Sequence, residues 1–171
     1  MSLPATLLSA LLLLASTNVT ATTDVSLATR NQHLFRYFFM DIYTATLYAP
    51  SNSNLTRLLE SQQPIRLTLQ YHRSIDRDDM IKAAMVTLKR QHPRSRLNPL
   101  LDEIEQLHAH FADVRDGDTY SLTRTAEGEL LLHHNGQLSF QSTTPGLAEL
   151  YLGIWLAPNG LSDDLRSALL R

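Results

Sequence analysis

The chain has 171 residues, a formal net charge of −2 and no cysteine. This length is typical of one domain, and the small negative charge argues against a basic surface of the kind that binds nucleic acid. Without cysteine, the chain has no disulfide bond, no thiol catalysis and no cysteine-ligated zinc.

The N-terminal segment has the features of an export signal. Residues 1–23 contain no Lys, Arg, Asp or Glu, and a short apolar run extends from Leu7 to Ala15. Val19-Thr20-Ala21 has the small-x-small form that signal peptidase reads. We therefore expect residues 1–21 to be a signal peptide, cleaved near Ala21, and residues 22–171 to form the domain of a periplasmic or secreted bacterial protein. A membrane anchor is the alternative, but the run is well short of the ~20 apolar residues that a spanning helix needs.

The first part of the domain predicts strands. Residues 34–49 are rich in aromatic and β-branched residues and lack Gly and Pro, so we expect one long strand that ends at Pro50. Alternation along this strand places Tyr43 on one face and Arg36 on the other. A short helix, capped by Ser53 or Asn54, is expected to reach about residue 62. Residues 65–73 alternate between apolar and polar side chains, as in a half-buried strand.

The middle of the chain predicts two helices. Residues 76–91 and 97–111 carry apolar side chains at helical spacing, and Pro93 separates them. Basic residues gather near the end of the first helix, where cations interact favourably with the helix dipole. The alternative for this basic end is a peripheral contact with an anionic membrane surface.

The last part predicts a hairpin of residues 119–125 and 129–134, followed by a strand over 137–141. Asn135-Gly136, between the last two, is a strong hairpin signal. A helix over 146–156 is expected to be capped by Thr143 or Thr144, and a final helix by Ser162. This order of elements predicts an α+β domain with a mainly antiparallel sheet and helices packed on it.

Four segments, taken in order, resemble the chalcone isomerase-like family in its bacterial exported branch. The resemblance covers about residues 27–171 and implies a large antiparallel sheet, a layer of helices on one face and an apolar cleft between them. The family includes isomerases that close a chalcone into a flavanone, fatty-acid-binding members and non-catalytic helpers. The segments are Phe39–Tyr48, Asp113–Asp118, His134-Asn135-Gly136, and Ile154-Trp155-Leu156 followed by Leu165–Leu170.

The resemblance does not extend to the isomerase chemistry. That reaction needs a cation near a phenolate and donors directed at an enolate oxygen; in the plant enzymes an Arg near the start of the long strand and a later Tyr and Asn supply them. Arg36 is the best candidate for the Arg, and Arg30 lies further upstream. Asp78 and Met85 fall where the Tyr and Asn would be. Because an ionised Asp repels the developing charge, we do not expect chalcone isomerase activity, and the catalytic residues of any other reaction remain unassigned.

Ligand binding depends less than catalysis does on the missing Tyr and Asn donors. A buried methylene contributes about 0.8 kcal/mol, so a long tail can offset an association cost of roughly 4–15 kcal/mol. We hypothesise that the chain binds a small amphipathic, fatty-acid-like ligand in the cleft, with Arg36 holding the carboxylate. Tyr43, Tyr71 and Trp155 are the other candidate ligand-binding residues. Each also has a plainer interpretation: Arg36 as a surface residue paired with a carboxylate, and the aromatic residues as core.

Two other functions remain open at this stage. The first is an isomerase or intramolecular lyase that acts on another enone-like substrate, with Arg36 as the electrophile. The second is an envelope protein-interaction module without a pocket. The sequence gives neither the ligand nor the oligomeric state.

No cofactor and no metal site are predicted. His108 and His110 lie about 200° apart around a helix, and His133 and His134 point to opposite faces of a strand, so neither pair suits a shared zinc ion. The acidic segment 113–118 lacks the spacing and the closing Glu of a calcium loop.

Overall fold

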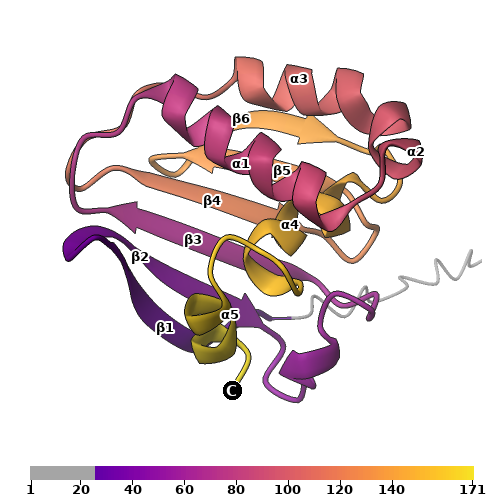
Figure 1. Ribbon diagram of the computed structural model, residues 1–171. Coiled ribbons are helices and arrows are strands. Elements are labelled where there is room, and N and C mark those ends of the chain that lie inside the picture. Colours follow the sequence, from indigo (N-terminus) through magenta and orange to yellow (C-terminus); the bar gives the residue numbers. More distant parts are fainter. Residues whose placement is uncertain (1–25) are drawn as a thin grey trace, which may run out of the picture.

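The computed structural model describes residues 26–171 and shows a sheet with helices packed against it (Figure 1). The sheet has six strands in the order of the sequence, and every neighbouring pair is antiparallel. This architecture confirms the expected α+β fold. The strands are β1 (Ala28–Tyr37), β2 (Met40–Ala49), β3 (Ile65–Tyr71), β4 (Thr119–Arg124), β5 (Leu130–His134) and β6 (Gln137–Ser142).

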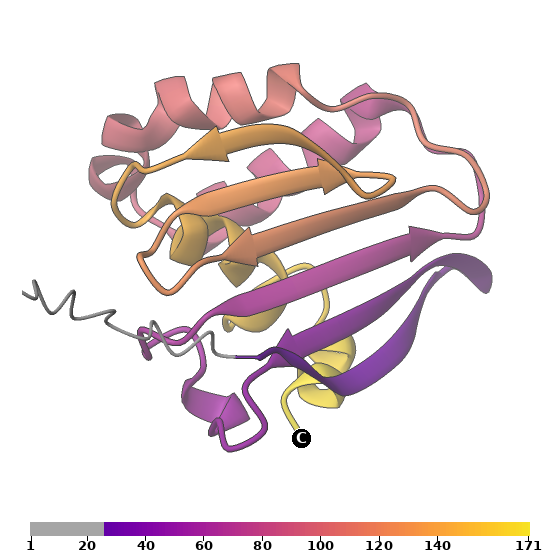
Figure 2. The same ribbon diagram turned by 180° about the vertical axis from the view of Figure 1, so that it is seen from behind.

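The α-helices lie on one face of this sheet, and the view from behind shows the other face without a helix over it (Figure 2). Side chains along β3 follow this division, since every second residue from Ile65 to Tyr71 is buried. On the uncovered face the hydroxyls of Thr68 and Ser121 are 2.8 Å apart and satisfy each other. The helices are η1 (Leu55–Arg57), α1 (Arg77–Gln91), α2 (Arg94–Leu97), η2 (Asn98–Leu100), α3 (Leu101–Ala109), α4 (Leu147–Leu156) and α5 (Asp163–Leu169).

The prediction of a single strand over residues 34–49 was wrong, because the chain reverses direction within this range. β1 and β2 form a hairpin whose two-residue turn is Phe38-Phe39. Both residues adopt left-handed backbone angles, with φ of 46° and 66°. Such turns normally carry Asn and Gly, so Phe38 and Phe39 carry no sequence signal for a reversal.

Three other expectations needed correction. The helix expected over 97–111 is divided into η2 and α3, because Pro99 lacks the amide hydrogen that a helix interior requires. The short helix α2 precedes η2 and was not predicted. Neither Thr143 nor Thr144 caps α4; its N-cap is Gly146, which adopts a φ of 82°. The helix expected to reach residue 62 is only the short η1, although Asn54 does cap it. By contrast, the Oγ of Ser162 accepts the amide of Leu165 and caps α5, as expected.

α4 is the central helix of the packed layer. All of its residues except Glu149 are buried. α4 contacts β4 of the sheet and packs against α1 in the helical layer (Figure 1). Within residues 26–171, no helix combines the length and the apolar character needed to cross a membrane.

A buried arginine ties the segment between β2 and β3 to this core. Arg124 is only 1% exposed, and its guanidinium donates to the backbone carbonyls of Leu58, Leu59 and Gln63. It also pairs with Glu149 of α4 at 3.2 Å. Because every donor direction is used within the fold, Arg124 acts as a structural clamp.

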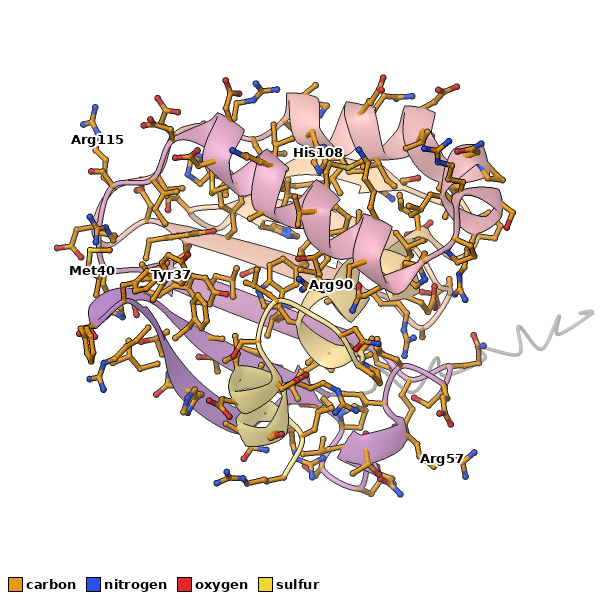
Figure 3. The ribbon with its side chains drawn as sticks, viewed as in Figure 1. Tyr37, Met40, Arg57, Arg90, His108 and Arg115 are labelled. Carbon is orange, nitrogen blue, oxygen red and sulfur yellow. The ribbon has the colours of Figure 1, made fainter. Side chains whose placement is uncertain are left out.

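The end of α1 is tied to the loop that follows α4. Arg90 donates to the carbonyls of Asn159 and Gly160, and Gln91 donates to those of Gly153 and Pro158. Figure 3 shows Arg90 next to this region. Arg90, one of the basic residues at the end of this helix, is therefore engaged within the fold.

Candidate functional site

A cavity of about 490 Å³ lies between the sheet and the helices α1 and α4. Its size falls within the range of about 300–1,000 Å³ that is usual for small-molecule sites. Most of its lining is apolar or aromatic, and Asp79 is the single charged residue among the lining residues of the described chain. The space therefore suits a largely apolar molecule.

One wall of the cavity is a row of aromatic rings on neighbouring strands. The register of the sheet pairs Phe35 with Tyr43 and Tyr43 with Tyr71. Their ring centroids are 5.1 and 5.7 Å apart, and Tyr120 on β4 continues the row at 6.4 Å from Tyr71. Paired residues of antiparallel strands share one face of the sheet, so the register itself builds this wall.

Two hydrogen bonds hold the opposite wall in place. Trp155 of α4 donates from Nε1 to the hydroxyl of Tyr43 at 3.1 Å. One turn earlier on α4, the hydroxyl of Tyr151 lies 2.9 Å from Nε2 of His108 on α3. Because buried polar atoms need partners, these pairs fix the positions of two large rings that line the cavity.

The tyrosine hydroxyls are the polar groups inside the cavity. Burial raises the pKa of Tyr43, and burial together with the neighbouring phenols raises the pKa of Tyr71. Both therefore remain protonated. Among the described residues, the hydroxyl of Tyr71 has only the sulfur of Met80 as a partner, at 3.4 Å, and sulfur is a weak acceptor. Tyr71 can thus donate to an oxygen atom of a bound molecule.

The mouth of the cavity is marked by its exposed and half-exposed lining residues. Tyr37 at the end of β1, Ile75 before α1, and Asp79 and Ala83 on α1 belong to this group, with Leu161 from the loop before α5. The opening therefore lies between the β1–β2 hairpin, the first turns of α1 and the loop before α5.

Three of the four sequence-predicted residues, Tyr43, Tyr71 and Trp155, line this cavity together, and Arg36 does not. Neighbouring residues of a strand point to opposite faces, so Phe35 and Tyr37 face the cavity while Arg36 does not. Its Nε instead donates to Asp41 at 2.7 Å in an exposed ion pair.

Arg36 borders a different hollow, of about 430 Å³, between β1 and the start of α5. Arg30 donates to the carbonyl of Pro50. Asp78 and Met85, which fall at the family's Tyr and Asn positions, are also absent from the cavity lining. The expected cation is therefore missing from the cavity walls within residues 26–171.

Several residues of the cavity lining were not predicted from the sequence, above all Phe35, Tyr120 and Tyr151. Tyr151 lies four residues before Trp155, a spacing that places both on the same side of a helix. Tyr120 and Leu122 alternate on one face of the β4 strand. These spacings were available, but nothing in the sequence showed which buried faces would be left unfilled.

The histidines do not form a metal site in the part of the chain that the structure describes. No group of three or more His, Asp or Glu side chains there is placed to hold an ion. His108 contacts Tyr151, and the ring of His110 pairs with the carbonyl of Gln106.

Comparisons with known proteins identify a family and a fold. The family described as chalcone isomerase-like matches residues 23–171. The crystal structure of the Arabidopsis thaliana fatty-acid binding protein AtFAP1 is similar, with a TM-score of 0.61, 16% sequence identity and 85% of each chain covered. At this identity the likeness shows the fold alone. No curated protein sequence matches the chain significantly.

The pair of His108 and Tyr151 predicts a pH dependence of stability. Burial, with the nearby Arg77, lowers the pKa of His108 from 6.5 to about 4. Well above pH 6.5 both the folded and the unfolded chain hold this ring neutral. As the pH falls from 6.5 towards 4, the unfolded chain takes up a proton that the folded chain refuses, so the free energy of unfolding decreases.

Replacing His108 by Gln keeps a neutral partner for Tyr151 and is expected to reduce this decrease. Urea unfolding of both proteins at pH 7 and pH 5 measures the difference. Burial also lowers the pKa of His92. Because His92 is present in both proteins, its contribution cancels when their losses of stability are compared. An equal loss of stability in the two proteins would show that His108 already accepts a proton in the fold.

Proposed function

This chain belongs to the chalcone isomerase-like family, and we propose that it is a non-catalytic protein that binds a small amphipathic, fatty-acid-like ligand. The supporting observation is the apolar cavity of about 490 Å³ between sheet and helices. AtFAP1, a fatty-acid binding protein, shares the fold. The unfilled cavity disfavours an interaction module without a pocket. The positions of Asp78 and Met85 outside the cavity lining give no support to an isomerase.

The energetics favour a ligand with a long apolar tail. Ten buried methylenes contribute about 8 kcal/mol at about 0.8 kcal/mol each. This exceeds the lower part of the association cost of roughly 4–15 kcal/mol. The walls also hold the cavity open before binding, so little further ordering of the protein is required. The tail therefore supplies most of the affinity, and the polar end supplies orientation.

Blocking the mouth tests this proposal. Ala83 lines the mouth from the exposed side of α1, so Ala83→Trp places a large ring across it. Binding of the uncharged dye Nile red is expected to weaken by about tenfold or more, a loss of about 1.4 kcal/mol. Val86→Trp is the matched control, because Val86 is exposed on the same helix outside the lining. Equal dye binding by the two variants, or no lipid retained by the parent protein in native mass spectrometry, would contradict the proposal.

The charges around the cavity bear on the polar end of the ligand. Among residues 26–171 neither Lys nor Arg lines the cavity, and Asp79 stands at its mouth. A carboxylate there would lose water without gaining a cation, which is costly. The protonated hydroxyls of Tyr43 and Tyr71 suit a neutral oxygen instead. We propose that the preferred acyl-like ligand has an uncharged polar end.

Competition between two ligands of equal chain length tests this preference. Dodecanol is expected to displace Nile red at a concentration about tenfold lower than dodecanoate does, since about 1.4 kcal/mol separates them. Asp79→Asn removes the negative charge at the mouth and is expected to reduce the difference in affinity between dodecanol and dodecanoate. Asp78→Asn is the control, because Asp78 lies beside Asp79 but outside the lining, and it should leave that difference in affinity unchanged. Tighter binding of dodecanoate than of dodecanol would refute an uncharged end.

We also propose that the chain is exported and cleaved near Ala21, so that it acts in the periplasm or outside the cell. These residues lie outside the described part of the structure. The proposal is supported by the uncharged apolar segment and its small-x-small site, and by a family match that begins at residue 23. The intact mass of the protein recovered from a bacterial culture is expected to correspond to a chain beginning at Thr22. A mass that includes the residues before Ala21 would contradict export by this route.

A further inference from the structure

The tip of the β1–β2 hairpin has a composition that the fold itself does not explain. Its two turn residues are Phe38 and Phe39, and both adopt left-handed backbone angles. Bulky side chains are rare in this conformation, and Asn or Gly would satisfy the same turn without strain. The chain therefore carries strained aromatic residues at a position where its own folding favours small polar ones.

These aromatic residues are also almost fully exposed. Phe38 is 75% exposed and Phe39 is 100% exposed, and they lie between Tyr37 and Met40, which are 57% and 42% exposed. We call residues 37–40 the aromatic tip. The other large exposed apolar residues of the described chain, Val86 and Leu138, stand singly on α1 and β6. Four consecutive exposed apolar residues indicate a contact outside the chain.

The aromatic tip is continuous with the mouth of the cavity. Tyr37 belongs to the tip and also lines the cavity. Its ring contacts that of Phe38 edge to face, with centroids 4.5 Å apart. Figure 3 shows Tyr37 and Met40 at the same end of the molecule. Whatever covers the tip therefore lies beside the opening of the cavity.

We propose that the aromatic tip inserts into the surface of a phospholipid bilayer and sets the cavity mouth against it. A stable protein interface buries about 800 Å² on each partner, and a projecting turn of four residues is much smaller than that. A fluid bilayer needs no complementary surface, and aromatic side chains partition well into its interfacial region.

The charges next to the tip fit the same arrangement. Arg36 and Asp41, the residue pair next to the aromatic tip in the hairpin, form an ion pair at 2.7 Å. The guanidinium of Arg73 lies against the sulfur of Met40. An apolar end with an arginine beside it matches the order of a lipid surface, in which the apolar region is followed by phosphate groups. Insertion of the tip would also let an apolar ligand pass between bilayer and cavity without crossing water.

The double variant Phe38→Asn, Phe39→Gly separates membrane contact from folding. It installs the Asn-Gly pair that this turn prefers, so the melting temperature is expected to stay the same or rise. Co-sedimentation with phosphatidylcholine vesicles is expected to fall by about tenfold or more, because two large apolar side chains are lost from the inserted part. Leu138→Ser, which removes an exposed apolar side chain from β6, is the matched control and should sediment like the parent.

Three results would overturn this inference. The first is a parent protein that does not sediment with the vesicles, or a double variant that sediments as well as the parent. The second is a marked fall in the melting temperature of the double variant, which would give the two Phe residues a structural role. The third is a parent dimer, seen by size-exclusion chromatography, that the double variant loses; the tip would then be an interface between two copies.

Nile red binding without vesicles keeps this inference separate from the proposed function. The double variant leaves the cavity lining intact and is expected to bind the dye as the parent does. Failure of dye binding in both proteins would count against the cavity proposal and leave the vesicle result to decide on the tip. All proteins compared share the same N-terminal residues, so differences in sedimentation report on the tip.

Discussion

The cavity depends on two buried hydrogen bonds that hold α4 in place. An unfilled apolar space is unfavourable, because its walls lose contacts that they would make by moving together. Collapse here would displace the rings of Tyr151 and Trp155 and separate them from His108 and Tyr43. Leaving a buried polar group unpaired costs about 1–3 kcal/mol. The pairing of these polar atoms therefore opposes closure of the space beside them.

The same architecture provides a binding space without the charged groups that the isomerase reaction requires. The walls come from the register of the sheet and the packing of α4, neither of which requires a charged group. Catalysis on an enone would require a cation and well-placed donors, yet Arg36 is directed away from the cavity and Asp79 stands at its mouth. The fold therefore forms the cavity independently of any catalytic group.

The sequence predicted elements well wherever local patterns were strong. Alternation located β3, the Asn135-Gly136 turn located the β5–β6 hairpin, and Ser162 marked the start of α5. The β1–β2 turn was missed because Phe38 and Phe39 carry no turn signal. Within β1, alternation turns Phe35 and Tyr37 towards the cavity and Arg36 away from it. Tyr43 reaches the cavity because the hairpin pairs it with Phe35. Which buried faces would remain unfilled depends on the distance between sheet and helices, a property that no local pattern contains.

The sheet's strand order has a consequence for how the molecule is completed. Each strand pairs with the next one along the chain. Short loops join β1 to β2, β4 to β5 and β5 to β6, so these pairs form between residues close in sequence, whereas helices α1 to α3 lie between β3 and β4. α4 follows the last strand and supplies Tyr151, Ile154 and Trp155 to the cavity. During synthesis all six strands are therefore made before the cavity can form. The C-terminal residues after β6 then add α4, which supplies the second wall of the cavity.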